Sequence, residues 1–437
     1  MAAAASTFVP GLGQLLNGRA RLAKWFALPI LLLAIVGFVA VSGRSPSRLV
    51  ASIVAPGILS VLLALNAAVL VWRLVAVGHA FFDRRYSGRP GALATIGIVV
   101  LLAAVAAPHL VLNSWGSTAQ TSFANVFTND DASKDPLAAP VDRGPGIDER
   151  LNLLLVAIDK TPDRPETLTD SMMVVSVDPI GNSVTMLSLP RDMVGVPLGN
   201  GEAFLPKLNS LMTYAEEHPQ KFPDGGMRAL QDAVGAMLGI RIHNYVKVDF
   251  FGFVKLVDAI GGVDVDVTRA FYDPLYDGLG VNPKGVRGWG ADVGLHHFNG
   301  WEAIAYSRTR RGVGESDFTR AARQQEILLA IRDKLVSDPG LMLNVPALFD
   351  AFDDLVQTDV PPALLPGLAA LAEEVETSNI VRVVLRRPLV KGGTDPVYGS
   401  VQRPSFAAIL KVAATLFPPA GIAPIPWPTP ASSQKPS

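Results

Sequence analysis

The chain has 437 residues, of which 49% are apolar, and its formal net charge is −1 at pH 7. Such a chain lacks the overall basic charge typical of nucleic-acid-binding proteins, so we expect no nucleic-acid partner. The absence of cysteine excludes disulfides, thiol catalysis and cysteine-ligated zinc.

Three long apolar stretches occupy much of the first 112 residues, at 25–41, 49–72 and 92–112. A helix needs about 20 apolar residues to cross a bilayer core of about 30 Å. These stretches also lack the polar stripe that marks a helix on the surface of a soluble protein. Residues 1–112 are therefore predicted to form a membrane region with about three transmembrane helices.

Basic residues in the short loops indicate how these helices are oriented. The loop between the first two stretches carries Arg44 and Arg48. More basic residues precede the first stretch or separate the second from the third: Arg19, Arg21, Lys24, Arg73, Arg84, Arg85 and Arg89. Because cytoplasmic loops are rich in Lys and Arg, we expect a multi-pass protein of the cell membrane. Its N-terminus is expected inside the cell and the chain after Leu112 outside.

The part after the membrane region divides by composition into four segments. Residues 113–147 are rich in Ser, Asn, Asp, Pro and Gly, which is typical of a linker. A globular domain is predicted over 148–340, and a C-terminal extension over 341–417 is expected to pack on it or complete it. The Pro-rich tail, 418–437, is predicted to be disordered.

Hydrophobic patterns predict alternating strands and helices in the outer part. Gly239 is expected to end one helix, and the pair Gly261 and Gly262 another. The expected strands are 151–158, 172–177, 184–189, 245–249, 263–267 and 379–385, the second and third forming a hairpin. The expected helices are 226–238, 250–260, 300–305, 317–336 and 406–416. The fold class is therefore α/β, with a mixed central sheet flanked by helices.

Two acidic residues stand at the ends of neighbouring predicted strands. Asp159 follows the first strand, and Asp170 lies directly before the second. Functional groups of α/β domains gather at the carboxyl ends of strands, and two carboxylates with a bound phosphate suit a divalent cation. From spacing alone, solvated loop acids or caps are the better explanation.

Two basic residues follow the predicted hairpin. Pro190 ends the second strand of the hairpin and directs Arg191 off its end, where a guanidinium suits bidentate contact with phosphate. Lys207 adds a cation near a predicted helix start. Each is ambiguous alone, because Arg191 could equally form a surface ion pair with Asp192.

The densest basic segment runs from Tyr306 to Gln325. If 306–310 is extended, Arg308 and Arg310 share one face and Arg311 lies on the other. On the helix that follows, Arg320 and Gln324 share a face, with Arg323 beside them. A cationic strand end beside a cationic helix start would clamp a diphosphate. The alternative is a solvated basic surface, which is where charge runs usually occur.

In their order along the chain, these segments resemble the LytR-CpsA-Psr family. The resemblance covers about 151–335 and is carried by Asn152–Asp159, Thr169–Pro179, Ser188–Asp192, Lys207–Asn209, Val248–Asp264, Phe298–Ala303, Tyr306–Arg310 and Asp317–Gln325. The sequence has Ala157 where the family usually has Gly, and 211–224 replaces an aromatic and glycine stretch. Members are anchored in the membrane with an outer catalytic domain.

The resemblance implies a phosphotransferase that moves a glycopolymer from a polyprenyl diphosphate to a peptidoglycan hydroxyl, forming a phosphodiester. It implies Mg²⁺, with Mn²⁺ as the alternative, on Asp159 and Asp170, either of which could act as base. The catalytic residues would be Asp159, Asp170, Arg191, Arg308 and Arg310. The diphosphate ligands would be Arg191, Lys207, Arg308, Arg310, Arg320, Arg323 and Gln324.

Membrane lipid is a further expected partner, and helices at 250–260 and 327–335 are expected to form an apolar groove for the polyprenyl chain. Two other functions remain open at this point. One is a polyprenyl-diphosphate hydrolase that uses water at the same site. The other is a non-enzymatic membrane regulator of the envelope or of transcription.

Overall fold

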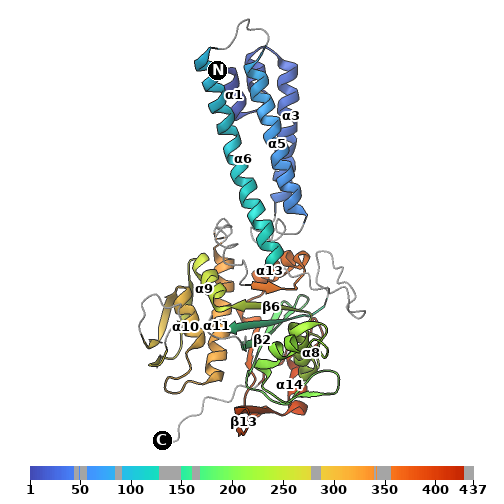
Figure 1. Ribbon diagram of the computed structural model, residues 1–437, viewed down its shortest axis with the longest axis vertical. Coiled ribbons are helices and arrows are strands. Elements are labelled where there is room, and N and C mark those ends of the chain that lie inside the picture. Colours follow the sequence, from blue (N-terminus) through green and yellow to red (C-terminus); the bar gives the residue numbers. More distant parts are fainter. Residues whose placement is uncertain are drawn as a thin grey trace. The chain divides into compact units, whose positions relative to one another are not determined.

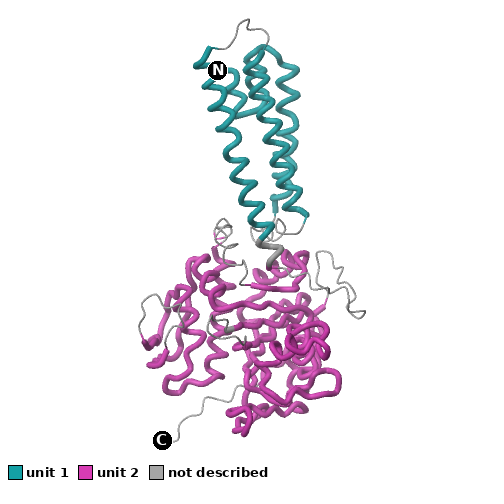
Figure 2. The backbone as a smooth tube through the Cα atoms, in the orientation of Figure 1, with its two compact units in different colours: residues 1–123 teal, residues 124–437 magenta. Residues whose placement is uncertain are grey.

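The computed structural model describes residues 1–43, 49, 57–83, 91–126, 149–159, 168–276, 287–338, 341 and 356–427. Within these ranges, the side chains of 122–125 and of Asp159 are not described. The chain forms two compact units, Met1–Phe123 and Ala124–Ser437 (Figure 2).

The first unit is entirely helical in its described part. It contains three helices long and apolar enough to cross a membrane: α3 (Ala20–Val41), α5 (Ile58–Phe81) and α6 (Ala92–Val126). This confirms the predicted number of apolar helices. The start of the second predicted span, at 50–56, lies outside the described residues.

Arg73 lies inside α5 and not, as predicted, in the loop after it. Its Nη2 donates to the Thr7 carbonyl at 2.7 Å, and its Nη1 lies 3.1 Å from His109 Nε2 on α6. An arginine inside a membrane helix is tolerated when such polar groups within the bundle receive it. Arg73 therefore does not count among the basic loop residues that indicate the orientation of the helices. Arg84, Arg85 and Arg89, the other cations of that loop, lie outside the described residues.

The third helix is longer than predicted, because α6 continues through residues expected in the linker. Four hydroxyls each donate to a backbone carbonyl one turn earlier in this helix: those of Ser114, Ser117, Thr118 and Thr121. Such bonds satisfy these polar side chains within a helix. The linker prediction is wrong for 113–126, and its remainder, 127–147, lies outside the described residues.

Two short helices, α1 (Ala2–Phe8) and α2 (Leu12–Leu16), pack against α5. Gly11 between them has a φ of +104°, which favours glycine, and a Cβ on Gly13 would lie 2.2 Å from the Ala2 carbonyl oxygen. The buried Gln14 side chain donates to the Ala76 carbonyl at 2.8 Å. These contacts fix the N-terminal turn on the long apolar helices.

A six-stranded sheet organises the second unit (Figure 1). Its order is β11-β6-β1-β2-β3-β12, and the strands are β1 (Leu151–Asp159), β2 (Leu168–Asp178), β3 (Ser183–Leu189), β6 (Asn244–Asp249), β11 (Val356–Thr358) and β12 (Ile380–Val384). The pairs β1–β6 and β3–β12 are parallel and the other pairs are antiparallel. The α/β fold class with a mixed sheet and the β2–β3 hairpin are therefore confirmed.

The main core lies between this sheet and helices α7 (Leu211–Glu217), α8 (Gly225–Leu238) and α14 (Phe406–Leu416). Alternate residues of β1, such as Leu154 and Val156, meet fully buried residues such as Met237 and Leu416. Gly239 ends α8 in the left-handed conformation, as predicted. Two short strands, β4 (Val196–Pro197) and β5 (Ala203–Phe204), pair beside this core.

A second core forms among α9 (Phe250–Ala259), α10 (Gly300–Arg308), α11 (Asp317–Ser337) and the β7–β10 pair, Val263–Val267 with Gly294–Phe298. The strands β8 (Phe271–Asp273) and β9 (Trp289–Ala291) pair next to it. Val257, Ile260, Ile327 and Ile331 are buried here against one another. The expected apolar groove between α9 and α11 is therefore wrong at these positions, because their side chains fill a closed core.

The C-terminal extension supplies both edge strands of the sheet, β11 and β12. It also contributes α13 (Leu365–Glu374) and the hairpin β13–β14, Val390–Asp395 with Gly399–Pro404. The prediction of a disordered tail is wrong for 418–427. Arg150 Nε donates to the Pro418 carbonyl at 2.8 Å, and the Asp178 carboxylate accepts from the Gly421 amide. Residues 428–437 lie outside the described residues.

Candidate functional site

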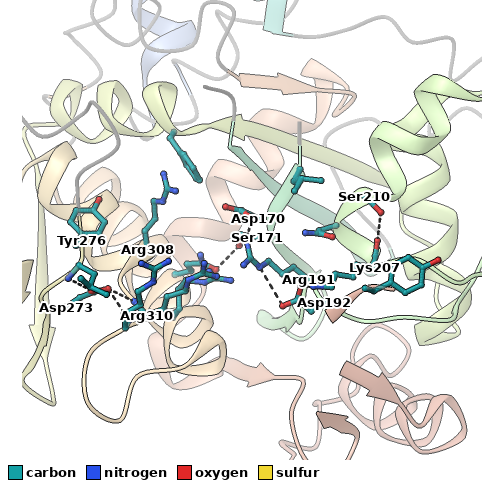
Figure 3. A pocket seen from close by; sticks show the side chains of 18 of the residues that line it. Asp170, Ser171, Arg191, Asp192, Lys207, Ser210, Asp273, Tyr276, Arg308 and Arg310 are labelled. Carbon is teal, nitrogen blue, oxygen red and sulfur yellow. Dashed lines mark hydrogen bonds and ion pairs between the residues drawn. The ribbon is translucent and has the colours of Figure 1, made fainter. Parts of the chain in front are cut away.

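A cleft of about 650 Å³ opens at one edge of the central sheet (Figure 3). Because β1, β3 and β6 run in the same direction, their carboxyl ends meet at this edge together with the start of β2. Seven residues singled out from the sequence line the cleft: Asp170, Arg191, Lys207, Arg308, Arg310, Arg320 and Gln324. The side chain of Asp159 is not described, although its backbone ends β1.

A β-bulge determines how Asp170 is presented. Ala157 of β1 pairs with Ser171, but the next residue, Ile158, pairs with Thr169. Asp170 is thus the extra residue of β2, with no partner position on β1. A bulge bends the strand and redirects the side chain of the extra residue, and Asp170 lines the cleft. The backbone of Asp159 pairs with Leu168, so both acids stand at the same strand ends.

On one side of the cleft, cations are paired with carboxylates that also face it. We call Asp170, Arg191, Asp192 and Lys207 the strand wall. Arg191 Nη1 donates a short hydrogen bond to Asp170 Oδ1, and Lys207 Nζ lies 3.0 Å from Asp192 Oδ1. The ion pair between Arg191 and Asp192, left open as an alternative from the sequence, is long, at 4.0 Å. Burial lowers the pKa of Arg191, but the carboxylates of Asp170 and Asp192 outweigh it and leave this pKa raised.

Four further arginines line the cleft, Arg308, Arg310, Arg311 and Arg320, which we call the arginine wall. The prediction that 306–310 is extended is wrong, because α10 begins with a capping box at Asn299 and continues to Arg308. Thr309, with a ψ of 135°, ends the helix. Arg308 stacks on Phe250, with its guanidinium carbon 3.8 Å from the ring centroid.

Arg311 lines the same cleft as Arg310, against the expectation that it would face the other way. The alternation of a strand does not apply to this segment, because its residues follow a helix end and do not belong to a ladder. Arg311 is the more exposed of the two residues.

Helix α11 brings Arg320 and Gln324 to the cleft, one turn apart. A capping box from Ser316 to Thr319 starts this helix, and Arg320 Nη2 lies 3.2 Å from Asp317 Oδ1. The Arg320 side chain is 10% exposed. Burial lowers the pKa of Arg320; Asp317 opposes this, and the nearby cation Arg191 lowers it further.

Arg323, predicted as a diphosphate ligand, does not line the cleft. It is buried behind the arginine wall, where its Nε donates to the Tyr306 carbonyl at 2.8 Å. Its terminal nitrogens contact the Glu315 carboxylate and the Thr309 carbonyl. The helical spacing correctly placed Arg323 next to Arg320 on α11. Three residues at about 100° of rotation each leave Arg323 about 60° around the helix from Arg320, on the side that faces α10.

Several lining residues were missed from the sequence. Asp273, Tyr276 and Phe250 contribute to the cleft, and Tyr398 comes from the β13–β14 hairpin. The sequence does carry a signal for Phe250, because Asp directly before it is a typical N-cap residue. In the structure the Gly252 amide donates to the Asp249 carboxylate at 2.7 Å, and α9 starts at Phe250. No local pattern marks Asp273 or Tyr398, because tertiary contacts alone bring them to the site.

The charge of the cleft is unbalanced. Among the described residues, six cationic side chains and three carboxylates line it: Arg191, Lys207, Arg308, Arg310, Arg311 and Arg320 against Asp170, Asp192 and Asp273. The Nε groups of Arg191 and Arg320 are buried there without a hydrogen-bond partner. A cavity with excess guanidinium groups is suited to a phosphate-bearing ligand.

A metal centre built from protein side chains alone is not found in the described part of the chain, where no three His, Cys, Asp or Glu residues cluster suitably. The oxygen donors of the cleft include the Asp170 carboxylate and the neighbouring Ser171 hydroxyl, which donates to Gln324 Oε1 at 2.7 Å. These are hard oxygen donors, the kind that Mg²⁺ takes together with phosphate oxygens. The residue types therefore fit such an ion.

Comparison with known proteins finds named relatives of this chain. The chain is 30% identical over 232 residues to the polyisoprenyl-teichoic acid–peptidoglycan teichoic acid transferase TagU of Halalkalibacterium halodurans, covering 51% of this chain and 68% of that protein. It is 34% identical over 203 residues to the corresponding Bacillus subtilis transferase TagV, covering 46% of each. The chain thus spans about two thirds of one relative and under half of the other.

Among solved structures, the crystal structure of Bacillus subtilis TagV aligns with a TM-score of 0.47 and 23% identity, over 62% of this chain and 97% of that one. The model of the LytR_cpsA_psr family matches residues 116–402, which is more than half of the chain. The matched segment contains every strand of the central sheet and both walls of the cleft. The chain belongs to the LytR_cpsA_psr family.

Proposed function

We propose that this protein is a phosphotransferase that moves a glycopolymer from a polyprenyl diphosphate to a hydroxyl of peptidoglycan. The observation that carries this proposal is the cleft with six cations and three carboxylates. A diphosphate brings the negative charge that such a cleft lacks, and guanidinium groups bind its oxygens in pairs. TagU and TagV bear the names of transferases with this type of donor and acceptor.

In the proposed reaction, the acceptor hydroxyl oxygen attacks the phosphorus that bears the glycopolymer. The bond from that phosphorus to the bridging oxygen breaks, and polyprenyl phosphate leaves. A new phosphodiester joins glycopolymer and peptidoglycan, and the hydroxyl proton passes to a carboxylate, Asp159 or Asp170. The arginine wall stabilises the negative charge that develops on the leaving phosphate.

We place Mg²⁺, or Mn²⁺ as an alternative, at Asp159 and Asp170. The support is the shared strand end of these two acids and the oxygen donors beside the cleft. Bound there, the cation would neutralise diphosphate oxygens. Arg191 contacts the same Asp170 carboxylate, so this arginine would lie beside the cation.

The proposal includes a membrane location with the second unit outside the cell. Three apolar helices of sufficient length support anchoring, and Arg19, Arg21 and Lys24 at the start of the first support an inside N-terminus. Reporter fusions after Asp83 and after Val126 should give inside and outside signals, respectively. An inside signal after Val126 would contradict the proposal, because peptidoglycan is then out of reach.

The direct test uses a polyprenyl-diphosphate donor with a labelled glycan, incubated with the full chain in lipid vesicles. We expect label in peptidoglycan only when peptidoglycan is supplied, with polyprenyl phosphate released in equal amount. Release of labelled glycan phosphate at the same rate without peptidoglycan would instead identify a hydrolase. No release of polyprenyl phosphate under either condition would reject both enzymes.

A further inference from the structure

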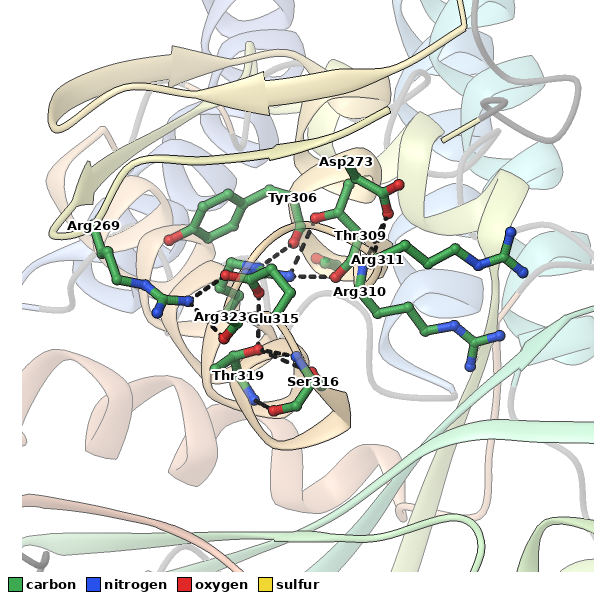
Figure 4. Close-up of polar contacts among 12 residues, drawn as sticks. Arg269, Asp273, Tyr306, Thr309, Arg310, Arg311, Glu315, Ser316, Thr319 and Arg323 are labelled. Carbon is green, nitrogen blue, oxygen red and sulfur yellow. Dashed lines mark hydrogen bonds and ion pairs between the residues drawn. The ribbon is translucent and has the colours of Figure 1, made fainter. Parts of the chain in front are cut away.

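The residues after the end of α10, which carry Arg310 and Arg311, belong to no helix or strand. Their backbone is fixed by the carboxylate of Asp273, which also lines the cleft. The amides of Arg310 and Arg311 both donate to Asp273 Oδ2, each at 3.1 Å (Figure 4). The other oxygen, Oδ1, accepts from the Leu275 amide at 3.0 Å. Asp273 is 3% exposed, so these bonds are shielded from water.

A guanidinium holds the same segment from the other side. Arg323 Nε donates to the Tyr306 carbonyl at 2.8 Å, and Nη2 donates to both the carbonyl and the hydroxyl of Thr309. These oxygens lie at the end of α10, where helix carbonyls lack partners within the helix. Arg323 also stacks over Phe271, with its guanidinium carbon 4.5 Å from the ring centroid.

Glu315 makes the burial of Arg323 tolerable. Its side chain is 1% exposed and contacts Arg323 Nη1 directly. Thr319 Oγ1 donates to the same carboxylate oxygen at 2.8 Å, and Arg269 contacts the other. Burial raises the pKa of Glu315, but the hydrogen bonds from Arg323 and Thr319 outweigh it and leave this pKa lowered. Removing one partner of such a buried pair leaves an uncompensated charge.

We infer that Asp273, Glu315 and Arg323 are positioning residues that hold 308–311 in the conformation which directs Arg308, Arg310 and Arg311 into the cleft. Figure 4 shows Arg310 and Arg311 extending away from the buried cluster. The hydrogen-bonding groups of Asp273 and Arg323 are engaged by the protein itself, and Arg323 does not line the cleft. The inference rests on the proposed function for its role in diphosphate binding, but its structural part does not.

The binding consequence follows from preorganisation. A charged clamp that is already in place does not lose binding energy to ordering its own loop. Residues that orient metal ligands typically change affinity by about 10- to 100-fold when removed. We expect an effect of that size on anion binding here, and a misplacement of about 1 Å can lower turnover by about 10²-fold.

The test combines hydrogen exchange with binding of inorganic pyrophosphate, using the full chain in detergent. The variants are Asp273→Ala and Arg323→Gln. The matched control is Arg332→Gln, an arginine on the same helix that donates to the Ala372 and Val375 carbonyls away from the cleft. We expect faster exchange of the amides at 308–311 and weaker pyrophosphate binding in both test variants, and neither change in the control.

Should Arg323→Gln fail to fold, the double variant Glu315→Gln with Arg323→Gln removes the uncompensated carboxylate and keeps the test open. Weaker binding with unchanged exchange would overturn the inference, because Asp273 or Arg323 would then act on the ligand directly. Faster exchange with unchanged binding would overturn it too. Both readouts work without any transfer reaction, so a failed glycopolymer assay would not be mistaken for failure of this inference.

Discussion

The two walls of the cleft hold their cations in different ways. On the strand wall, Arg191 and Lys207 are neutralised inside the cleft by Asp170 and Asp192. On the arginine wall, the carboxylates of Asp273, which lines the cleft, and Glu315, which is buried behind it, support the segment 308–311. Asp273 binds backbone amides and Glu315 pairs with Arg323, so neither neutralises the guanidinium groups of Arg310 or Arg311.

Because of this difference, we expect the two walls to contribute differently to ligand binding. An anion that enters must compete with carboxylates on the strand wall, whereas Arg310 and Arg311 on the arginine wall are positioned through their backbone amides. Asp317 is the nearest acid there, at 3.2 Å from Arg320 and 3.7 Å from Arg310. We therefore expect most anion affinity to come from the arginine wall, and control by metal and protons to come from the strand wall.

The largest effect is expected on the arginine wall. Arg310→Ala and Arg320→Ala should each lower turnover by about 10²–10³, the usual result of removing a donor that stabilises developing charge. Arg310→Lys should also be impaired, because it keeps the charge but loses the planar fork. Arg311→Ala should lose less, since Arg311 is exposed and its field is screened.

The control for this series is Arg228→Ala, which removes an exposed arginine from α8 outside the cleft. All variants should be compared at one ionic strength. Equal losses of turnover in Arg310→Ala, Arg311→Ala and Arg228→Ala would mean that only the overall charge of the protein matters. The proposed difference between the two walls would then be wrong.

On the strand wall, Asp170→Asn should abolish the response of turnover to Mg²⁺ while the thermal transition stays close to that of the parent. The reason is that Asp170 is half-buried at a strand end and contributes little to the core. A magnesium titration of turnover, paired with a melting curve, makes the measurement. A variant that responds to Mg²⁺ like the parent would move the cation to other residues.

A smaller and opposite effect is expected from Asp192→Asn. This change removes the counter-ion of Lys207 without removing a cation, so pyrophosphate should bind more tightly. This ion pair is half-buried, so we take about 1 kcal/mol, the upper end for surface pairs, which corresponds to a gain of about fivefold. Titration calorimetry would measure it. Weaker binding in Asp192→Asn would show that the carboxylate positions Lys207 and does not compete with the ligand.

The smallest expected effect concerns the pH dependence of folding stability, which we expect to be independent of ligand binding in the cleft. Burial raises the pKa of Asp359 to about 6, from 3.8, at a site next to β6. The folded state then holds this proton more tightly than the unfolded state. Its contribution should make the protein more stable as the pH falls through 6 toward 3.8, and less stable as the pH rises through that window.

Asp359→Asn should flatten this contribution, and melting temperatures at pH 5 and pH 7 would measure the change. Pyrophosphate binding at the two pH values should be affected equally in parent and variant, because Asp359 does not line the cleft. If the variant keeps the full pH dependence of stability, another group is responsible.

Local patterns predicted most elements of the second unit. α14 has the predicted bounds, and the hairpin of β2 and β3 and the glycine end of α8 were also predicted correctly. These features depend on side-chain periodicity and on turn residues, which are properties of neighbouring residues in the chain. Predictions failed where a helix continued past its apolar residues, as in α6 and at Arg308.

What the sequence determined by itself is the class of the protein. The apolar stretches, the strand and helix periods and the ordered motifs from Asn152 to Gln325 are enough to predict membrane helices, a mixed α/β domain and the family. These signals are local or cumulative, so they do not depend on which side chains finally meet.

Only the tertiary structure decided which charges face the ligand. The bulge at Asp170 arises from the register between β1 and β2, and the burial of Arg323 depends on Glu315 and the end of α10. Asp273 is far from Arg310 in the chain and reaches its amide through the packing of β8. The physical reason is that the partners of a charged residue decide whether it binds the ligand or positions other residues. These partners are far away in the chain, and the spacing of residues does not specify them.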